Sequence, residues 1–183
     1  PGQYYIYVGA YSEADVTPFT LSVTDPATTP ATAGDPLAGL TTTTTATLLE
    51  HRNEAPQFGE YVAPPRIRPD PAVVTGTAGG PNDAGNLGGD CRGYISGPPS
   101  HRLRVAERRD LGVVVHAEND DATLVIAKAD GTIVCNDDRY GRDPAIFGSF
   151  PPGDHAIWVG AYNMNSQFEY ALGFTGRRAL RSQ

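Results

Sequence analysis

The chain has 183 residues, enough for one sizeable domain or for one domain with an appendage. Its formal net charge of −7 at pH 7 argues against a nucleic-acid or anionic-membrane surface, because phosphate binding requires clustered Lys and Arg. No apolar run approaches the roughly 20 residues that span a bilayer, and 21 Gly with 16 Pro residues favour an all-β fold with many turns.

The start of the chain, Pro1–Thr24, repeats the stretch Pro152–Thr175 near its end without a gap. Each copy predicts two alternating strands joined by a polar loop, which we interpret as a β-hairpin. A hairpin alone is not stable in water, and the first copy has no strands of its own before it. The matched residues include Ile6 with Ile157, Tyr7 with Trp158, Val8-Gly9-Ala10-Tyr11 with Val159-Gly160-Ala161-Tyr162, Phe19 with Tyr170, and Leu21 with Leu172.

Residues Pro1–Asp25 therefore read as an orphan β-hairpin that is apolar or aromatic on both faces, as expected of strands covered on both sides. Without covering strands, its unpaired backbone edges would be prone to pair with other chains. The residues predicted to form its assembly interface are Tyr4, Tyr5, Ile6, Tyr7, Val8, Tyr11, Phe19, Leu21 and Val23.

Residues 26–70 form a Thr- and Pro-rich linker. Pro26–Thr45 is typical of an extended stalk, whereas β-branched Thr at Thr41–Glu50 favours a strand; both alternatives stay open. The prolines that follow allow at most a short edge strand around Tyr61–Val62.

Residues 71–176 predict seven or eight short strands, the size of an antiparallel, jelly-roll-like β-sandwich. Asp130-Gly131 is the strongest turn signal and predicts that Thr123–Lys128 pairs with Thr132–Cys135. Residues 177–183 are a basic tail.

The two cysteines, Cys91 and Cys135, lie in predicted strands of this domain. A disulfide between them would indicate an oxidising compartment and close a loop of about 45 residues, worth roughly 3–5 kcal/mol by loop-closure entropy. The alternative is two unpaired buried thiols, which behave as small hydrophobes.

The stretch LVIAKADGTIVCNDD (Leu124–Asp138) is followed by FPPGDHAIWVGAY and then by EYALGFT. This order of motifs resembles the pre-peptidase C-terminal domains of bacterial secreted proteins. His155 and Ala156 stand where that family usually has aromatics. Gly76–Val105 is similar to a tandem-repeat subgroup with paired cysteines. The resemblance implies a secreted, non-catalytic sandwich, often appended to exported proteases, and does not cover residues 26–70.

Calcium is the candidate cofactor. Carboxylates in neighbouring loops suit a cation that takes six to eight oxygen ligands, and we predict Asp121, Asp137 and Asp138 as its ligands, near Asp120 and Asp143. The alternative is that these residues serve turn geometry, and a D-x-D-x-D-G loop is absent from the sequence.

Other patterns do not predict catalysis. The four His residues lack zinc-ligand spacing, and Ser96, Ser100, His101 and Asp110 lack the context of a nucleophile elbow. The arginines Arg102, Arg104, Arg108 and Arg109 read as a solvated strand face.

We therefore expect a non-enzymatic, extracellular structural protein. In the preferred hypothesis the N-terminal hairpin adds to a neighbouring subunit, which gives head-to-tail homopolymers: filaments or a surface layer. The alternative is a monomeric accessory or binding module processed from a larger exoprotein. Because the chain starts at Pro1, inside a repeat unit, we expect an excised piece that has lost any export signal.

Overall fold

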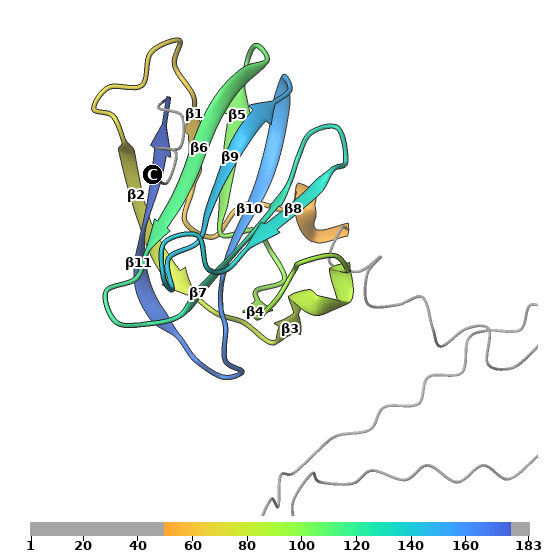
Figure 1. Ribbon diagram of the computed structural model, residues 1–183. Helices are drawn as coiled ribbons and strands as arrows, with labels where there is room; N and C mark the ends of the chain where they lie inside the picture. The colour runs from red at the N-terminus through yellow and green to blue at the C-terminus, as the bar shows by residue number, and fades with distance from the viewer. Residues whose placement is uncertain (1–49, 177–183) are drawn as a thin grey trace, which may run out of the picture. The chain divides into compact units, whose positions relative to one another are not determined.

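Two sheets, antiparallel except for one parallel strand pair at an edge, pack face to face as a β-sandwich (Figure 1). The structure, a computed structural model, describes residues 50–176; predictions for residues 1–49 and 177–183 lie outside the described residues. The all-β class and the sandwich predicted from the sequence are confirmed. No described helix is long and apolar enough to cross a membrane.

The elements follow one another as short strands with two 3₁₀ turns. They are η1 (His51–Asn53), β1 (Glu60–Val62), β2 (Ala72–Ala78), β3 (Asn82–Asp83), η2 (Ala84–Leu87), β4 (Tyr94–Ile95), β5 (His101–Val105), β6 (Arg109–His116), β7 (Ala122–Ala127), β8 (Ile133–Asn136), β9 (Ala145–Phe150), β10 (Gly153–Ala161) and β11 (Phe168–Thr175).

Each sheet is built around one of the last two strands. The seven-stranded sheet places β5 and β4 on one side of β10 and β7 on the other, with β1, β3 and β8 at its margins. The four-stranded sheet runs β2-β11-β6-β9, so that β11 lies between β2 and β6. β10 and β11 are therefore interior strands, hydrogen-bonded on both edges.

This arrangement corrects the hairpin expected for the C-terminal copy. β10 pairs with β4, β5 and β7, whereas β11 pairs with β2 and β6, and the two strands do not pair with each other. The turn between them crosses from one sheet to the other. Alternating residues specify a strand and its buried face but do not specify which strand it pairs with.

Two local predictions are confirmed. β7 pairs with β8 across Asp130-Gly131, where Gly131 has φ +86° and the Thr132 N–H donates to the Asp130 side chain. An edge strand forms at Glu60–Val62 and pairs in parallel with β5. Through this pairing the sandwich extends upstream of Pro71, where the sequence placed a linker.

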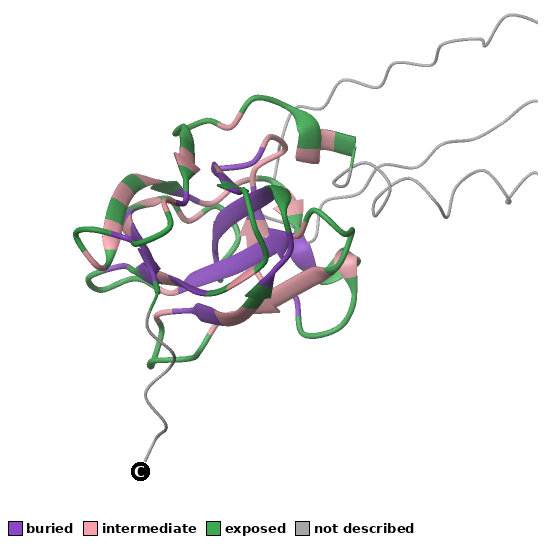
Figure 2. Cartoon of the chain, turned by 90° about the horizontal axis from the view of Figure 1, so that it is seen from above, coloured by how far each residue is buried: buried purple, intermediate pink, exposed green. Residues whose placement is uncertain are grey.

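The core fills the space between the sheets (Figure 2). Alternate residues of each strand point inward, as the period of two requires. Tyr61 of β1 stacks on Phe174 of β11, with ring centroids 4.4 Å apart, and so closes one side of the core. The largest wholly buried members are Phe150, Phe174, Leu103, Leu124, Ile126, Ile157 and Leu172.

Gly160 of β10 allows a close approach of β4. A Cβ at this position would lie 2.5 Å from the Tyr94 carbonyl oxygen and 2.7 Å from Ile95 Cγ2 and Thr123 Oγ1. The Tyr94 carbonyl belongs to the backbone of β4, so it cannot move aside without distorting that strand. Only glycine therefore fits at position 160.

We predict that Gly160→Ala lowers the free energy of unfolding by about 1–3 kcal/mol, because it overpacks this contact. Gly148→Ala on β9 is the matched control, since a Cβ there has no atom within 4 Å. Urea unfolding curves measure both, and equal stability of the two variants would contradict the assignment.

Candidate functional site

Residues 79–97, here called the cover, lie over the outer face of the seven-stranded sheet. Within them β3 pairs with β4, and β4 pairs with β10 at Tyr94 and Ala161. A second hydrophobic cluster lies beneath the cover, separate from the core between the sheets. The cover contributes Ala84, Cys91 and Ile95 to it, and the sheet contributes Val125, Ala127, Ala156 and Trp158. The domain thus has a partial third layer.

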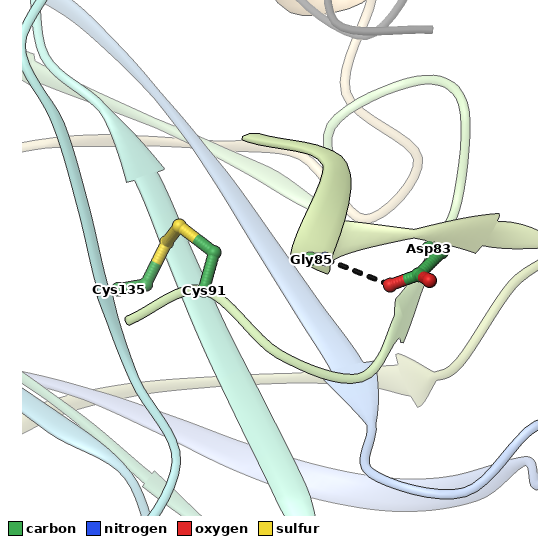
Figure 3. The surroundings of a disulfide bond; sticks show 4 residues. All are labelled: Asp83, Gly85, Cys91 and Cys135. Atoms are coloured by element: carbon green, nitrogen blue, oxygen red, sulfur yellow. Dashed lines mark hydrogen bonds between the residues drawn. A yellow bond between two sulfur atoms is a disulfide. The ribbon is translucent and has the colours of Figure 1, made fainter. Parts of the chain in front are cut away.

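Local hydrogen bonds shape the cover (Figure 3). The Asp83 side chain accepts from the Gly85 N–H at 2.8 Å and so caps η2. Gly88, which ends η2, has φ +81°, a conformation that favours glycine. These residues belong to a Gly-rich stretch between β3 and β4.

A disulfide joins Cys91 of the cover to Cys135 of β8 (Figure 3). The Cα atoms are 4.9 Å apart, and 44 positions separate the residues in sequence. Of the two alternatives left open by the sequence, the disulfide is therefore the one observed. It ties the irregular cover to a strand at the margin of the sheet.

Trp158 is the side chain that the cover shields most clearly. It is 2% exposed, and its indole N–H donates to the Gly97 carbonyl at 3.1 Å. It is also the one tryptophan of the whole sequence, so tryptophan fluorescence reports on the contact between the cover and β10.

The predicted calcium ligands come from two neighbouring loops. Asp121 precedes β7, while Asp137 and Asp138 follow β8. Burial, then the charge of Asp138 and that of Asp137, raise the pKa of Asp121, whereas Arg142 lowers it. The loops are therefore close enough to interact.

These loops do not assemble a metal-binding group within residues 50–176. Asp143, a further member of the predicted cluster, instead accepts from His116 Nδ1 at 2.7 Å and from the Ala117 N–H at 3.0 Å. Calcium binding at Asp121, Asp137 and Asp138 stays a prediction.

The residues considered for a catalytic triad have separate structural contacts. Ser100 Oγ accepts from the Val159 N–H at 3.0 Å, and Ser96 Oγ donates to the Pro98 carbonyl at 2.8 Å. Asp110 lies on β6, in the other sheet from His101 on β5. No Ser-His-Asp arrangement follows from these positions.

The four histidines are also dispersed. His51 and His116 are on the surface and pair with Glu54 and Asp143. Buried His155 accepts from the Ala129 N–H and donates to the Pro151 carbonyl, and burial lowers its pKa. It is therefore a neutral bridge between loops.

The arginine face is occupied by intramolecular contacts. Arg104 makes two hydrogen bonds to Asp154, and Arg102 bonds Glu60 together with the carbonyls of Arg52 and Glu54. The guanidinium of Arg109 donates to the carbonyls of Pro64 and Pro65. Arg102, Arg104 and Arg109 thus hold residues 52–65 against the sandwich.

An aromatic cluster that the sequence did not predict seals the sandwich between β5 and β2. Phe58 packs against His101 and Tyr170, with ring centroids 5.8 and 6.5 Å away, and lies over Gly76. His101 Nε2 and the Tyr170 hydroxyl are buried without a hydrogen-bond partner among the described residues. Burial lowers the pKa of His101 to about 4, and the Gly59 backbone offsets only part of this.

An open hollow of about 590 Å³ lies at residues 65–70, between β1 and β2 in sequence. Arg66, Arg68 and Arg109 are among the residues that line it. Its lining contains no Ser, Cys or His, so it does not bring a nucleophile and a base together.

The predicted assembly interface lies outside the described residues. It comprises Tyr4, Tyr5, Ile6, Tyr7, Val8, Tyr11, Phe19, Leu21 and Val23. The structure describes the C-terminal copy of these positions, in β10 and β11.

Comparisons with known proteins give a likeness at the level of the fold. No family model matches the chain, and no curated protein matches it. The fold is similar to the crystal structure of the pre-peptidase C-terminal domain of collagenase from Bacillus anthracis. The match has 13% identity and a TM-score of 0.44, and covers 67% of this chain and 99% of that one.

We predict that Cys91→Ser/Cys135→Ser lowers the free energy of unfolding by about 3–5 kcal/mol, from a closed loop of this length. Because the cover loses its tie to β8, Trp158 emission should shift to longer wavelength before the sandwich unfolds. Fluorescence and far-ultraviolet circular dichroism in urea separate the two events. Coincident transitions at unchanged stability would contradict a stabilising role for the disulfide.

We predict that His101 destabilises the fold in acid. Its pKa is about 4 in the folded chain and 6.5 when unperturbed, so the unfolded chain binds the proton first. The stability is complete above pH 6.5 and falls as the pH drops toward 4, by up to about 3 kcal/mol.

Unfolding measurements at several pH values check this. His101→Phe should reduce the loss between pH 6.5 and 4. The control is His116→Gln, which removes a surface histidine whose pKa Asp143 raises. An unchanged pH profile of His101→Phe would refute the assignment.

Proposed function

We propose that the chain is a non-catalytic accessory module of a secreted protein, and that residues 1–24 supply the two interior strands of a second sandwich of the same kind. The observation that carries this proposal is the position of β10 and β11. They are the interior strands of the two sheets, and residues 1–24 repeat both in sequence.

The inward positions support the equivalence. Six inward side chains of β10 and β11 are at most 3% exposed, so an interior copy needs an apolar or aromatic residue at each of these positions. The copy has one at all six, whereas Phe168, a partly buried inward residue at the start of β11, matches Thr17. The pairs are His155 with Tyr4, Ile157 with Ile6, Val159 with Val8, Tyr170 with Phe19, Leu172 with Leu21 and Phe174 with Val23.

The outward positions support it independently. Gly9 matches Gly160, where a Cβ would collide with the Tyr94 carbonyl of the cover. Tyr7 matches Trp158, which bonds to the cover through a ring N–H. The copy thus carries the residues suited to a sandwich that has its own cover.

The described sandwich has no vacant place for this copy. Both interior positions are filled by its own β10 and β11, so a second molecule could accept residues 1–24 there only after losing them. Displacement would expose most of the core between the sheets. This favours a module in a tandem array over strand exchange between identical chains.

A secreted, non-enzymatic role is supported by two further observations. A disulfide between Cys91 and Cys135 is typical of oxidising compartments. The buried Ser100 and His155 make structural hydrogen bonds to backbone groups rather than to each other or to an open cavity.

Head-to-tail assembly is the second candidate. The observation that favours it is that the copy is apolar or aromatic at the six positions matching the most buried inward residues, which requires a covering surface. If another molecule supplied that surface, the contact would be heterologous and would give open filaments.

We expect a peptide of residues 1–24 to restore folding to a chain of residues 25–151, which lacks both copies, because the peptide would take the interior positions left by β10 and β11. A peptide of residues 152–175 is the positive control, and Ile6→Asp/Leu21→Asp in the first peptide is the matched negative control. Circular dichroism spectra and thermal melts followed by circular dichroism monitor folding. Rescue by 152–175 but not by 1–24 would refute the equivalence.

Electron microscopy of the intact chain separates the two candidates. The accessory-module proposal expects no open-ended polymers, whether or not residues 1–25 are deleted. Filaments that disappear on this deletion would favour head-to-tail assembly instead.

A further inference from the structure

The hollow beside the loop that joins β1 to β2 is positively charged (Figure 1). Its volume is about 590 Å³, and it opens to solvent. The charged residues of its lining are Arg66, Arg68, Arg109 and Asp70, which together give a net formal charge of +2. The chain as a whole carries −7, so the hollow is a local concentration of positive charge on an acidic protein.

Two of these arginines have no carboxylate to neutralise them. Arg66 and Arg68 are exposed and form no ion pair with residues 50–176. Arg102 and Arg104 on β5 differ in this respect, because each pairs with an acidic side chain of the sandwich. The guanidinium groups of Arg66 and Arg68 therefore keep their donors available to a ligand.

The third arginine is also uncompensated in charge. Arg109 donates to the carbonyls of Pro64 and Pro65, which are neutral acceptors. The acidic residue of the lining, Asp70, accepts from Thr175 Oγ1 at 2.6 Å. This hydrogen bond holds one carboxylate oxygen toward β11, and one negative charge remains against three positive ones.

The loop that carries Arg66 and Arg68 is held in place before any ligand binds. Ile67, between the two arginines, is 6% exposed and belongs to the core between the sheets. The Ala63 N–H donates to a carbonyl of β5 at 2.9 Å. Residues 63–71 also include four prolines, whose rings fix φ. A site that is ordered in advance loses less conformational entropy on binding.

We propose that this hollow binds an oxyanion group with two negative charges, of the sulfate or phosphate type. Guanidinium groups present planar pairs of N–H donors that match the oxygens of such anions. A dianion balances the net charge of +2 that the lining carries. The proposal goes beyond the accessory role and does not depend on residues 1–24.

A neighbouring hollow extends the positive surface. Its volume is about 340 Å³, it shares Pro65 and Arg109 with the first hollow, and it adds Arg108 and Glu107. An anionic group that is attached to a polymer has room to continue there, whereas a free ion occupies the first hollow alone. The chemistry that the arginines recognise is the same in both cases.

Titration of the intact chain with sodium sulfate tests the proposal. Sulfate replaces chloride at constant ionic strength, and NMR follows the arginine Nε–Hε groups. We expect the signals of Arg66, Arg68 and Arg109 to shift saturably with sulfate and not with chloride alone. Because the site is open to solvent, added sodium chloride should weaken binding. A chain without a saturable shift of these signals would overturn the proposal.

Variants locate the site. Arg68→Gln should weaken sulfate binding about fivefold, the upper range for one exposed charge pair, and Arg66→Gln should act in the same direction. Arg92→Gln is the matched control, because it removes the same charge from an exposed arginine of the cover, outside the hollow. Circular dichroism checks that each variant is folded. Equal weakening by Arg68→Gln and Arg92→Gln would show nonspecific attraction and overturn the proposal.

Dextran sulfate and unsulfated dextran distinguish the two sources of the anion. Competition with inorganic sulfate by dextran sulfate, reduced in Arg68→Gln and absent with dextran, identifies a polymer-borne group and supports the site. Binding of inorganic sulfate alone identifies a free ion and also supports it. If a segment of residues 1–49 filled the hollow, neither probe would bind, and the proposal would be wrong.

Discussion

The structure depends on the two interior strands, β10 and β11. Each is hydrogen-bonded on both edges and buried on the face toward the other sheet. The buried faces of such strands tolerate neither a charge nor an unpaired backbone group, because both would be removed from water without compensation. β4, β5 and β7 are the neighbours of β10, and β2 and β6 are those of β11.

The cover follows from the outer face of β10. Ala156, Trp158 and Gly160 present an apolar surface away from the core, and exposed in water it would be a sticky patch. Residues 79–97 remove it from solvent, although they contain only four strand residues and a short 3₁₀ turn. Such an irregular segment has little cooperative structure of its own, and the Cys91–Cys135 bond restricts its alternatives in the unfolded chain.

Sequence reasoning predicted those features that depend on neighbouring residues. Period-two alternation identified the strands, and Asp130-Gly131 identified the β7–β8 hairpin. It paired β10 with β11 incorrectly, because a crossing between sheets and a turn within one sheet have the same local pattern. It missed the packing of Phe58 on His101 and Tyr170 because these residues lie on separate segments, and no local pattern indicates that they meet.

Interior and edge strands determine different kinds of association. An interior strand can belong only to a sandwich that lacks it, because both of its edges must find partners at once. On the proposed function, residues 1–24 repeat such a pair in sequence and serve another sandwich that lacks it. An edge strand has one free side, so it can join sandwiches that are already complete.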